Sequence, residues 1–181
     1  AYSGDPTALA TIAEQYGARY VVLKRLGERV AGIDVPADGL ASPNEPKGTG
    51  KVVDTNHYEY LSVMPNDKVS FEVWSPADRT ATLVLRAKRR NQAQATLGTL
   101  SVNGTPSIIA DSELPRNSWA DIRRDVALKA GRNEVRLESG AQLEVIRVAA
   151  YSLTAADLPA SWRVAHDDGW YVVFDTQGGA R

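Results

Sequence analysis

Short segments that alternate apolar and polar residues dominate the chain from Lys51 onward. Residues 69–74 and 81–87 alternate in this way, so each presents one apolar and one polar face, as a half-buried β-strand does. Further along, Asn103-Gly104 adopts the positive backbone angles of a tight hairpin turn. Many short strands separated by turns, with helical patterns only near the two ends of the chain, predict a mainly β protein. The expected fold is an antiparallel β-sandwich, or jelly roll.

A second turn is expected at 129–133, where the sequence is KAGRN. It lies between the strand segments 126–128 and 135–137, and it resembles Asn103-Gly104 in its position between two apolar runs. The two segments are therefore expected to be consecutive antiparallel strands. The last strand of the series is expected at 143–148, where the sequence is LEVIRV.

The first residues of the chain predict a helix followed by a strand. Asp5 and Pro6 favour a helix start, because Asp accepts hydrogen bonds from the free amides of the first turn and Pro is tolerated at the first helical position. Apolar residues then recur at helical spacing, and Gly17 is suited to end the helix in a left-handed conformation. The apolar run 20–23 follows directly and predicts a buried strand.

The last residues predict a short helical turn and a hairpin. Thr154 and Asp157 have the spacing of a capping box, which starts a turn that ends at Pro159. Residues 162–175 then predict two strands joined at Asp167-Asp168-Gly169, with Trp162 and Trp170 packing the hairpin against its neighbour. We expect this hairpin to pack with the N-terminal helix and strand, so that together they form a small α/β appendage beside the sandwich.

The turn formers between Gly32 and Lys51 mark a boundary between these parts. Pro36, Asp38-Gly39, Pro43, Pro46 and 48–50 lie close together there and predict a linker or a long crossing loop. Three segments are therefore expected: 1–50 as the N-terminal helix-strand unit and linker, 51–151 as the sandwich, and 152–181 as the C-terminal turn and hairpin.

Charge and composition exclude several classes of partner. The 21 Lys and Arg residues balance 22 acidic residues, so no general nucleic-acid or anionic-membrane partner is expected. Cysteine is absent, which excludes a disulfide framework and thiol chemistry. No run approaches the roughly 18 apolar residues that span a bilayer. The sequence begins AYSGDP rather than with Met, so we expect a piece or a processed product of a longer protein.

The residue types that carry catalysis are sparse or wrongly spaced. The chain has two histidines, His57 and His166, and neither lies in a metal-ligand pattern such as H-x-x-x-H. The sequence Gly48-Thr49-Gly50-Lys51 lacks the spacing of a phosphate loop. No G-x-S-x-G elbow is present, and no spacing singles out a pair of carboxylates for glycoside hydrolysis. The chain itself is predicted to be non-catalytic.

Residues 86–90, with the sequence RAKRR, place four basic side chains close together. One interpretation is a solvated edge strand, because charges on an edge discourage pairing between molecules. The other is a contact for phosphates, lipid head groups or acidic glycans. We favour the edge strand.

Three motifs together carry a resemblance to a known class of module. A strand that ends in SVNGT, the pattern L-x-x-G-x-N-x-V-x-L at 128–137 and the final LEVIRV strand resemble carbohydrate-binding modules, especially families six and thirty-five. In these families an aromatic residue just before the V-x-L-x-x-G strand lies in a ligand-binding loop, and Trp119 has that place here. The resemblance covers about Lys51 to Tyr151.

The resembled families also imply a structural calcium ion, which this sequence does not favour. They use an early acidic residue and an Asp in the last strand, where this chain has Glu144 and lacks the early Y-E-A-E element. Because calcium needs about six to eight oxygen ligands, neither calcium nor any other cofactor is expected.

Sugar recognition requires flat apolar surfaces for the C–H face of the ring and directional polar groups for the hydroxyls. The loops 54–60 and 116–121 both combine aromatic residues with polar ones. The candidate carbohydrate-binding residues are Asn56, Tyr58, Tyr60, Asn117, Trp119 and Asp121. The alternative is that Trp119 covers an open end of the sandwich and that Tyr58 and Tyr60 lie on an ordinary strand.

Three functions follow from these patterns. The first is a non-catalytic carbohydrate-binding accessory domain of a larger glycan-active protein. The second comes from DPTALATIAEQYGARYVVL, which is similar to the start of extracytoplasmic domains that follow the last membrane helix of multi-spanning bacterial glycosyltransferases. The third is a structural or protein-interaction sandwich without sugar affinity. The expected partners are a glycan and the remainder of a membrane-embedded parent, and the expected location is extracytoplasmic.

Overall fold

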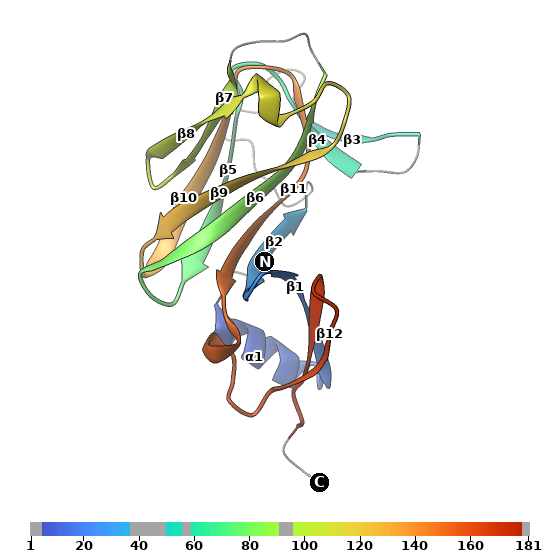
Figure 1. Ribbon diagram of the computed structural model, residues 1–181, viewed down its shortest axis with the longest axis vertical. Coiled ribbons are helices and arrows are strands. Elements are labelled where there is room, and N and C mark those ends of the chain that lie inside the picture. Colours follow the sequence, from blue (N-terminus) through green and yellow to red (C-terminus); the bar gives the residue numbers. More distant parts are fainter. Residues whose placement is uncertain (1–4, 37–49, 56–58, 91–95, 179–181) are drawn as a thin grey trace.

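The computed structural model describes residues 5–36, 50–55, 59–90 and 96–178 of the chain. It is a mainly β structure with one α-helix among these residues (Figure 1). The helix is α1 (Pro6–Gln15) and the strands are β1 (Tyr20–Leu26), β2 (Arg29–Pro36), β3 (Gly50–Val53), β4 (Glu59–Val63), β5 (Lys68–Ser75), β6 (Arg79–Arg89), β7 (Thr96–Val102), β8 (Thr105–Ala110), β9 (Ala120–Leu128), β10 (Gly131–Ser139), β11 (Leu143–Leu153), β12 (Arg163–Asp167) and β13 (Tyr171–Asp175). Two single turns of 3₁₀-helix, η2 (Asp111–Glu113) and η3 (Ala155–Asp157), complete the elements.

Two antiparallel sheets form the sandwich, as the alternation predicts. The small sheet has four strands in the order β5-β10-β7-β8. The large sheet has nine strands: β12-β13-β1-β2-β11-β4-β3 follow one another, and β6 and β9 continue from the other side of β11. Apolar residues of both sheets meet in one core, in which Leu83 and Leu85 of β6 and Val135 and Leu137 of β10 are buried. The core lies between the sheets, so each strand needs only one apolar face.

The Asn103-Gly104 turn is confirmed as the tight hairpin between β7 and β8. Both residues have positive φ, 50° for Asn103 and 79° for Gly104, and Val102 pairs with Thr105 across the turn. This turn is local, so two adjacent residues are enough to specify it.

The expected antiparallel pairing of 126–128 with 135–137 is wrong. β9 pairs with β6 in the large sheet, whereas β10 pairs with β5 and β7 in the small sheet. The turn KAGRN therefore connects the two sheets as an arch. Buried Asn133 holds it: the side-chain oxygen accepts from the Lys129 amide at 2.8 Å and from Asn103 Nδ2 at 2.7 Å. The Asn133 side-chain amide donates to the Lys129 carbonyl at 2.9 Å.

The interpretation of 86–90 as an edge strand is also wrong. β6 lies between β9 and β11 and pairs with both along most of its length. Its charged residues tolerate this central position because acidic partners from other strands and loops face them. Arg86 pairs with Asp121 at 2.8 Å, Lys88 with Glu144 at 2.7 Å, and Arg89 with Asp111.

The two ends of the described chain form the expected α/β appendage, which lies below the sandwich in Figure 1. The Asp5 side chain accepts from the Thr7 amide at the start of α1, and Gly17 has a φ of 60° where the helix ends. β1 pairs with β13, and β12 pairs with β13. A small core of six buried residues joins these elements: Leu23, Val30, Leu153, Leu158, Val172 and Phe174.

The loop expected after Gly32 begins later than the turn formers suggest. β2 continues to Pro36 and pairs with β11 of the sandwich, while its first residues pair with the end of β1. β2 therefore joins the N-terminal helix-strand unit directly to the large sheet. Residues 37–49 lie outside the described ranges.

Candidate functional site

An aromatic residue and a lysine lie together at one end of the large sheet, on the face turned away from the core. The half-buried Trp119 precedes β9 directly, and its ring meets the ring of buried Tyr60 edge to face, with centroids 6.3 Å apart and planes at 62°. The ammonium of Lys88 lies 4.6 Å from the Trp119 ring centroid and 6.0 Å from that of Tyr60. Cation–π attraction and edge contacts hold the indole in one position.

Strand register explains why these residues meet. Ala120, the first residue of β9, pairs with Ala87 of β6. Trp119 comes just before Ala120 and Lys88 just after Ala87, so the two lie opposite each other. Lys88 in turn pairs with Glu144 of β11, and Glu144 pairs with Ser62 of β4 on its other side. The four adjacent strands β9, β6, β11 and β4 therefore carry these side chains across one face. We call Tyr60, Lys88, Arg90, Trp119 and Glu144 the Trp119 cluster.

Glu144 fixes the cations of the Trp119 cluster. Its side chain is 2% exposed, and its two carboxylate oxygens face the Lys88 ammonium at 2.7 Å and the Arg90 guanidinium. The hydrogen bond to Glu144, and more weakly the one to Tyr60, raise the pKa of Arg90. A buried carboxylate is tolerated only when opposite charges face it, so Glu144 positions both basic side chains next to the aromatic pair.

The same two contacts decide against Glu144 as a calcium ligand. Its oxygens are turned toward cations, which repel a metal ion, and calcium needs several oxygen ligands in one place. Within the described ranges, no group of three or more His, Asp or Glu side chains is placed to hold a metal ion. The residues present do not fit a calcium site at this position.

The structure brings some of the predicted site residues together. Tyr60 and Trp119 are in contact. Asn117 lies exposed in the loop before β9 with a φ of 55°, and its amide donates to the Arg89 carbonyl at 3.1 Å. Exposed Asp121 lies on the same sheet face, paired with Arg86. Asn56 and Tyr58 lie outside the described residues.

Sequence reasoning missed Lys88, Arg90 and Glu144 as members of this site. The sequence showed the basic run at 86–90 but gave no sign of which residues lie beside it. Its partners come from distant segments, since 56 positions separate Lys88 from Glu144 in sequence, counted from 88 to 144. Only the pairing of β6 with β9 and β11 reveals the contacts.

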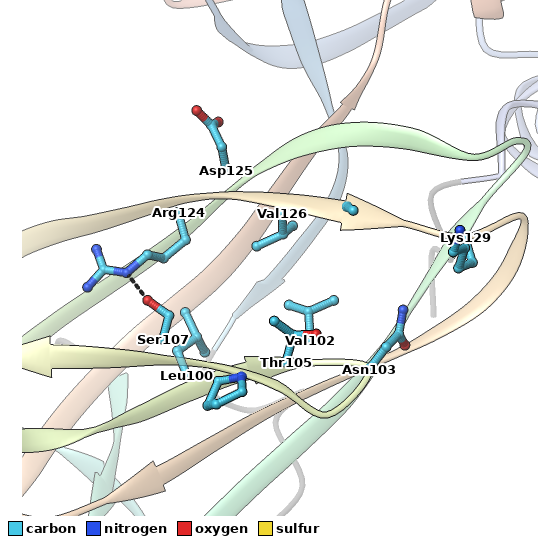
Figure 2. Close-up of a pocket in the computed structure, with 11 residues that line it drawn as sticks. Leu100, Val102, Asn103, Thr105, Ser107, Arg124, Asp125, Val126 and Lys129 are labelled. Atoms are coloured by element: carbon cyan, nitrogen blue, oxygen red, sulfur yellow. Dashed lines mark hydrogen bonds between the residues drawn. The ribbon is translucent and has the colours of Figure 1, made fainter.

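A further cavity lies elsewhere, between the β7–β8 hairpin and β9. Figure 2 shows this cavity of about 440 Å³, which is walled by apolar side chains such as Leu100, Val102 and Val126. At one end Arg124 donates to Ser107 at 2.5 Å and pairs with Glu113 at 2.7 Å. The Arg124 hydrogen bond lowers the pKa of Glu113, although burial opposes the shift. None of the Trp119 cluster lines this cavity.

Comparison with known proteins identifies the fold of the sandwich. No protein-family model matches the chain, and no curated protein does. Solved structures do match, among them a family 35 carbohydrate-binding module from Clostridium thermocellum, at 17% identity and a TM-score of 0.51, covering 66% of this chain and 98% of the module. A GH26-CBM35 β-(1,4)-mannanase from Podospora anserina matches at 17% identity and a TM-score of 0.52 over 75% of this chain. A Listeria monocytogenes protein in complex with glucose, magnesium and calcium matches at 18% identity and a TM-score of 0.55 over 67%.

These matches concern one part of each larger chain. This chain spans 29% of the mannanase and 12% of the Listeria protein, but nearly all of the isolated module. No helix among the described residues is long and apolar enough to cross a membrane. The sandwich has the fold of family 35 carbohydrate-binding modules, with an α/β appendage beside it.

Proposed function

We propose that this chain is a non-catalytic carbohydrate-binding accessory domain of a larger glycan-active protein. The observation that carries the proposal is the half-buried Trp119, held by Tyr60 and Lys88 at one end of the sandwich. The exposed part of a fixed indole offers the flat apolar surface that the C–H face of a sugar ring needs. The fold supports this role, because isolated modules of family 35 share it.

The residues around Trp119 have distinct roles in this proposal. Trp119 makes the stacking contact, while Tyr60 is too deeply buried, at 7% exposure, to offer its face and instead positions the indole. Asn117 and Asp121 are exposed near Trp119 and bind the sugar hydroxyls. Asn56 and Tyr58, which the sequence places in the neighbouring loop, complete the proposed contacts.

Binding of the protein to polysaccharide tests the proposal. Affinity gel electrophoresis against a panel of plant and bacterial polysaccharides should retard the wild-type chain on at least one of them. Trp119→Ala should lose about tenfold or more in affinity, because a stacked aromatic residue often dominates binding of this kind. The matched control is Trp74→Ala, since Trp74 is also half-buried but lies on β5 of the other sheet.

Two outcomes contradict the proposal. Equal retardation of wild type and Trp119→Ala on every polysaccharide that binds would show that Trp119 is not part of the binding site. No retardation of either protein on any polysaccharide, confirmed on a glycan array, would instead favour a structural or protein-interaction sandwich without sugar affinity.

The parent protein and its location belong to the same proposal. An extracytoplasmic location suits a domain that meets polysaccharide. The alternative parent, a membrane-embedded glycosyltransferase in which the domain positions an acceptor glycan, is supported by the N-terminal sequence DPTALATIAEQYGARYVVL alone. Genomic sequence upstream of Ala1 discriminates: several hydrophobic segments favour the transferase, and a hydrolase or lyase domain favours the glycan-degrading parent.

A further inference from the structure

The backbone at Trp170, at the tip of the β12–β13 hairpin, is held by hydrogen bonds. The Asp168 side chain accepts from the amides of Trp170 at 2.8 Å and Tyr171 at 2.7 Å, and the Trp170 carbonyl accepts from the Arg25 amide at 2.7 Å. The Trp170 residue is 76% exposed, so it does not pack the hairpin against its neighbour as the sequence predicted. A large aromatic side chain that is exposed on a defined turn is a candidate ligand contact.

A cleft lies beneath this tip, between the appendage and the outer face of the large sheet. Along β6, Leu83 and Leu85 point into the core, so Val84 points to the outer face. Val84 packs there with Ala149 and Tyr151 and forms the apolar floor of the cleft. Trp170 and Tyr171 line it from the appendage side, and the cavity measures about 100 Å³. We call this space the hairpin cleft.

The charges around the hairpin cleft are unbalanced. Four basic residues line it, Lys24, Arg25, Arg123 and Arg147, and one acidic residue, Asp121. This excess of positive charge contrasts with the chain as a whole, which carries a net charge of −1. A concave site with one sign of charge concentrates ligands of the opposite sign.

Two of these basic residues have no acidic partner in the part of the chain that the structure describes. Lys24 pairs with Asp34, Arg25 with Asp167, and Asp121 with Arg86. Arg123 and Arg147 form no ion pair with any residue of the ranges 5–36, 50–55, 59–90 and 96–178. Both arginines lie next to Val84 on the outer face. Arg123 of β9 pairs directly with Val84 of β6. Arg147 of β11 pairs with Arg86, which is two positions from Val84 on the same face of β6. Two free guanidinium groups therefore face one small cleft.

We propose that the hairpin cleft binds a phosphorylated saccharide, with Arg123 and Arg147 holding the phosphoryl group and Trp170 stacking on the sugar ring. Guanidinium groups bind phosphate oxygens through paired, charge-assisted hydrogen bonds. A phosphate monoester carries about −1.5 to −2 charge at neutral pH, which matches two free cations better than a single carboxylate does. Burial raises the pKa of the Tyr151 hydroxyl on the floor, so this group stays protonated and is available as a donor.

The size of the cleft decides which part of the ligand enters it. The hairpin cleft, at about 100 Å³, is much smaller than the cavity of about 440 Å³ between the β7–β8 hairpin and β9. We therefore place the compact phosphoryl group in the cleft and the larger sugar ring at its mouth. The ring therefore stays outside, against the exposed indole of Trp170.

This site is separate from the one proposed at Trp119. The hairpin cleft depends on residues of the appendage, Trp170, Tyr171 and Arg25, and none of the Trp119 cluster lines it. Both sites lie on the outer face of the large sheet. Lys88, Arg86 and Val84 are every second residue of β6 and point to this face, with Lys88 at the Trp119 cluster and Val84 at the hairpin cleft. Asp121 lines the hairpin cleft and is also a proposed contact beside Trp119, so the two sites are told apart by Trp119 and Trp170, each of which belongs to one of them.

Isothermal titration of the full chain tests the proposal with four probes at low ionic strength. Glucose 1-phosphate should bind tighter than inorganic phosphate, because only the sugar ester can stack on Trp170. Glucuronate should bind more weakly than glucose 1-phosphate, and glucose should not bind at this cleft. Raising NaCl from about 20 mM to about 500 mM should weaken both phosphate ligands, because salt screens the guanidinium contacts.

Two sets of variants separate the charged contact from the aromatic one. The double variant Arg123→Gln with Arg147→Gln should weaken glucose 1-phosphate and inorganic phosphate at least about tenfold, since hydrogen bonds to charged groups are the strong ones. Trp170→Ala should weaken glucose 1-phosphate to the level of inorganic phosphate and leave inorganic phosphate unchanged. The matched controls are Arg132→Gln, 79% exposed on the other sheet, and Tyr16→Ala, 77% exposed at the end of α1 and not part of the lining of the hairpin cleft.

Several results would overturn the proposal. These are no binding of glucose 1-phosphate, salt-independent binding, an equal loss in Arg132→Gln, and glucuronate binding as tightly as the phosphate ester. Trp119→Ala distinguishes this proposal from the proposed function: it should leave glucose 1-phosphate binding unchanged. If Trp119→Ala abolishes that binding, the phosphate ester belongs to the Trp119 site and the hairpin cleft is not a site.

Discussion

The sandwich and the appendage are held together by different means. In the sandwich, 23 buried apolar residues form a single core between the two sheets. In the appendage, six buried residues form the core, and two of them, Val30 and Leu153, belong to β2 and β11 of the large sheet. Because apolar burial is the dominant favourable term in folding, we expect the core of the sandwich to be large enough for it to fold without the appendage. The appendage depends on its connections to the sandwich.

Polar contacts add to the apolar contacts of Val30 and Leu153. Arg79 of β6 binds Asp157 of η3 through two hydrogen bonds of 2.8 and 2.7 Å. Within the appendage, the Thr176 amide donates to the Arg19 carbonyl at 2.9 Å and its hydroxyl to the Ala18 carbonyl at 2.8 Å. Contacts of this kind are specific in geometry but modest in net stability. We therefore expect substitutions in the two regions to differ in how much they lower the free energy of unfolding and in how far through the protein their effect extends.

The largest expected effect is that of a truncation in the sandwich core. Leu85→Ala should lower the free energy of unfolding by about 3–5 kcal/mol, because Leu85 is fully buried and its loss leaves a cavity. The counterpart, Leu23→Ala in the appendage, should cost about 2 kcal/mol, at the low end for such changes. Urea unfolding followed by circular dichroism measures both values.

Hydrogen exchange shows how far through the protein each of these two substitutions loosens the structure. Leu85→Ala should increase amide exchange throughout the protein, whereas Leu23→Ala should increase it in β1 and β13 and leave β5 and β10 protected. Uniform loss of protection in Leu23→Ala would mean that the appendage and the sandwich unfold as one unit, and the contrast between them would be lost.

A smaller effect is expected at the arch between the two sheets. Asn133→Ala should cost about 2–3 kcal/mol, because it removes a buried side chain and leaves the Lys129 amide and carbonyl without partners. Asn103→Gly is the control: it keeps the positive φ of the turn and removes two hydrogen bonds, the one to Asn133 and the one that the Asn103 side-chain oxygen accepts from the Glu134 amide at 3.0 Å. Because it leaves Asn133 on the Lys129 amide and carbonyl, it should cost only about 1 kcal/mol. Similar losses for both variants would show that the turn between β7 and β8, and not the arch, is the critical element.

The smallest of the three effects lies at the connection between the regions and depends on pH. Hydrogen bonds from Arg79, and then from Thr154, lower the pKa of Asp157 from 3.8 to about 2. A lowered pKa adds stability that is fully present above pH 3.8 and is lost as the pH falls through about 2. Asp157→Asn should therefore cost about 2 kcal/mol at pH 7, and this difference from wild type should shrink steadily below about pH 4.

Denaturant unfolding of both proteins at pH 7, 4 and 3 provides the measurement. Asp78→Asn serves as the comparison, because Asp78 is exposed and binds Lys129 and the Ala130 amide instead of Arg79. A wild-type minus Asp157→Asn difference that stays constant down to pH 3 would exclude the ion pair with Arg79 as its origin.

The features that the sequence predicted correctly depend on neighbouring residues. Asp5, Asn103-Gly104 and the Thr154/Asp157 capping box each act on a few adjacent backbone groups, and the structure confirms all three. Pairing of the two chain ends was predicted as well, because an isolated helix-strand unit and an isolated hairpin both need a partner.

The incorrect predictions concern which strand lies beside which. The turn at 129–133 was recognised, but the same turn residues suit a hairpin and an arch, so the change of sheet was missed. The run 86–90 resembles an edge strand until Glu144, Asp121 and Asp111 are brought beside it. Of the candidate site, Trp119 and Tyr60 were found through their residue types. The cations that hold Trp119, and the exposure of Trp170, depend on contacts between distant segments.

The pairing of β1 with β13 has a mechanical consequence. Tyr20 pairs with Asp175 at the outer end of this ladder, so a pull on these two residues opens the strands like a zipper, one pair at a time. Tension then passes to Val30 and Leu153, which are again paired at the near end of the β2–β11 ladder. Because the hydrogen bonds of the β1–β13 ladder are loaded one at a time, we expect a pull on Tyr20 and Asp175 to open the appendage at a lower force than the sandwich core.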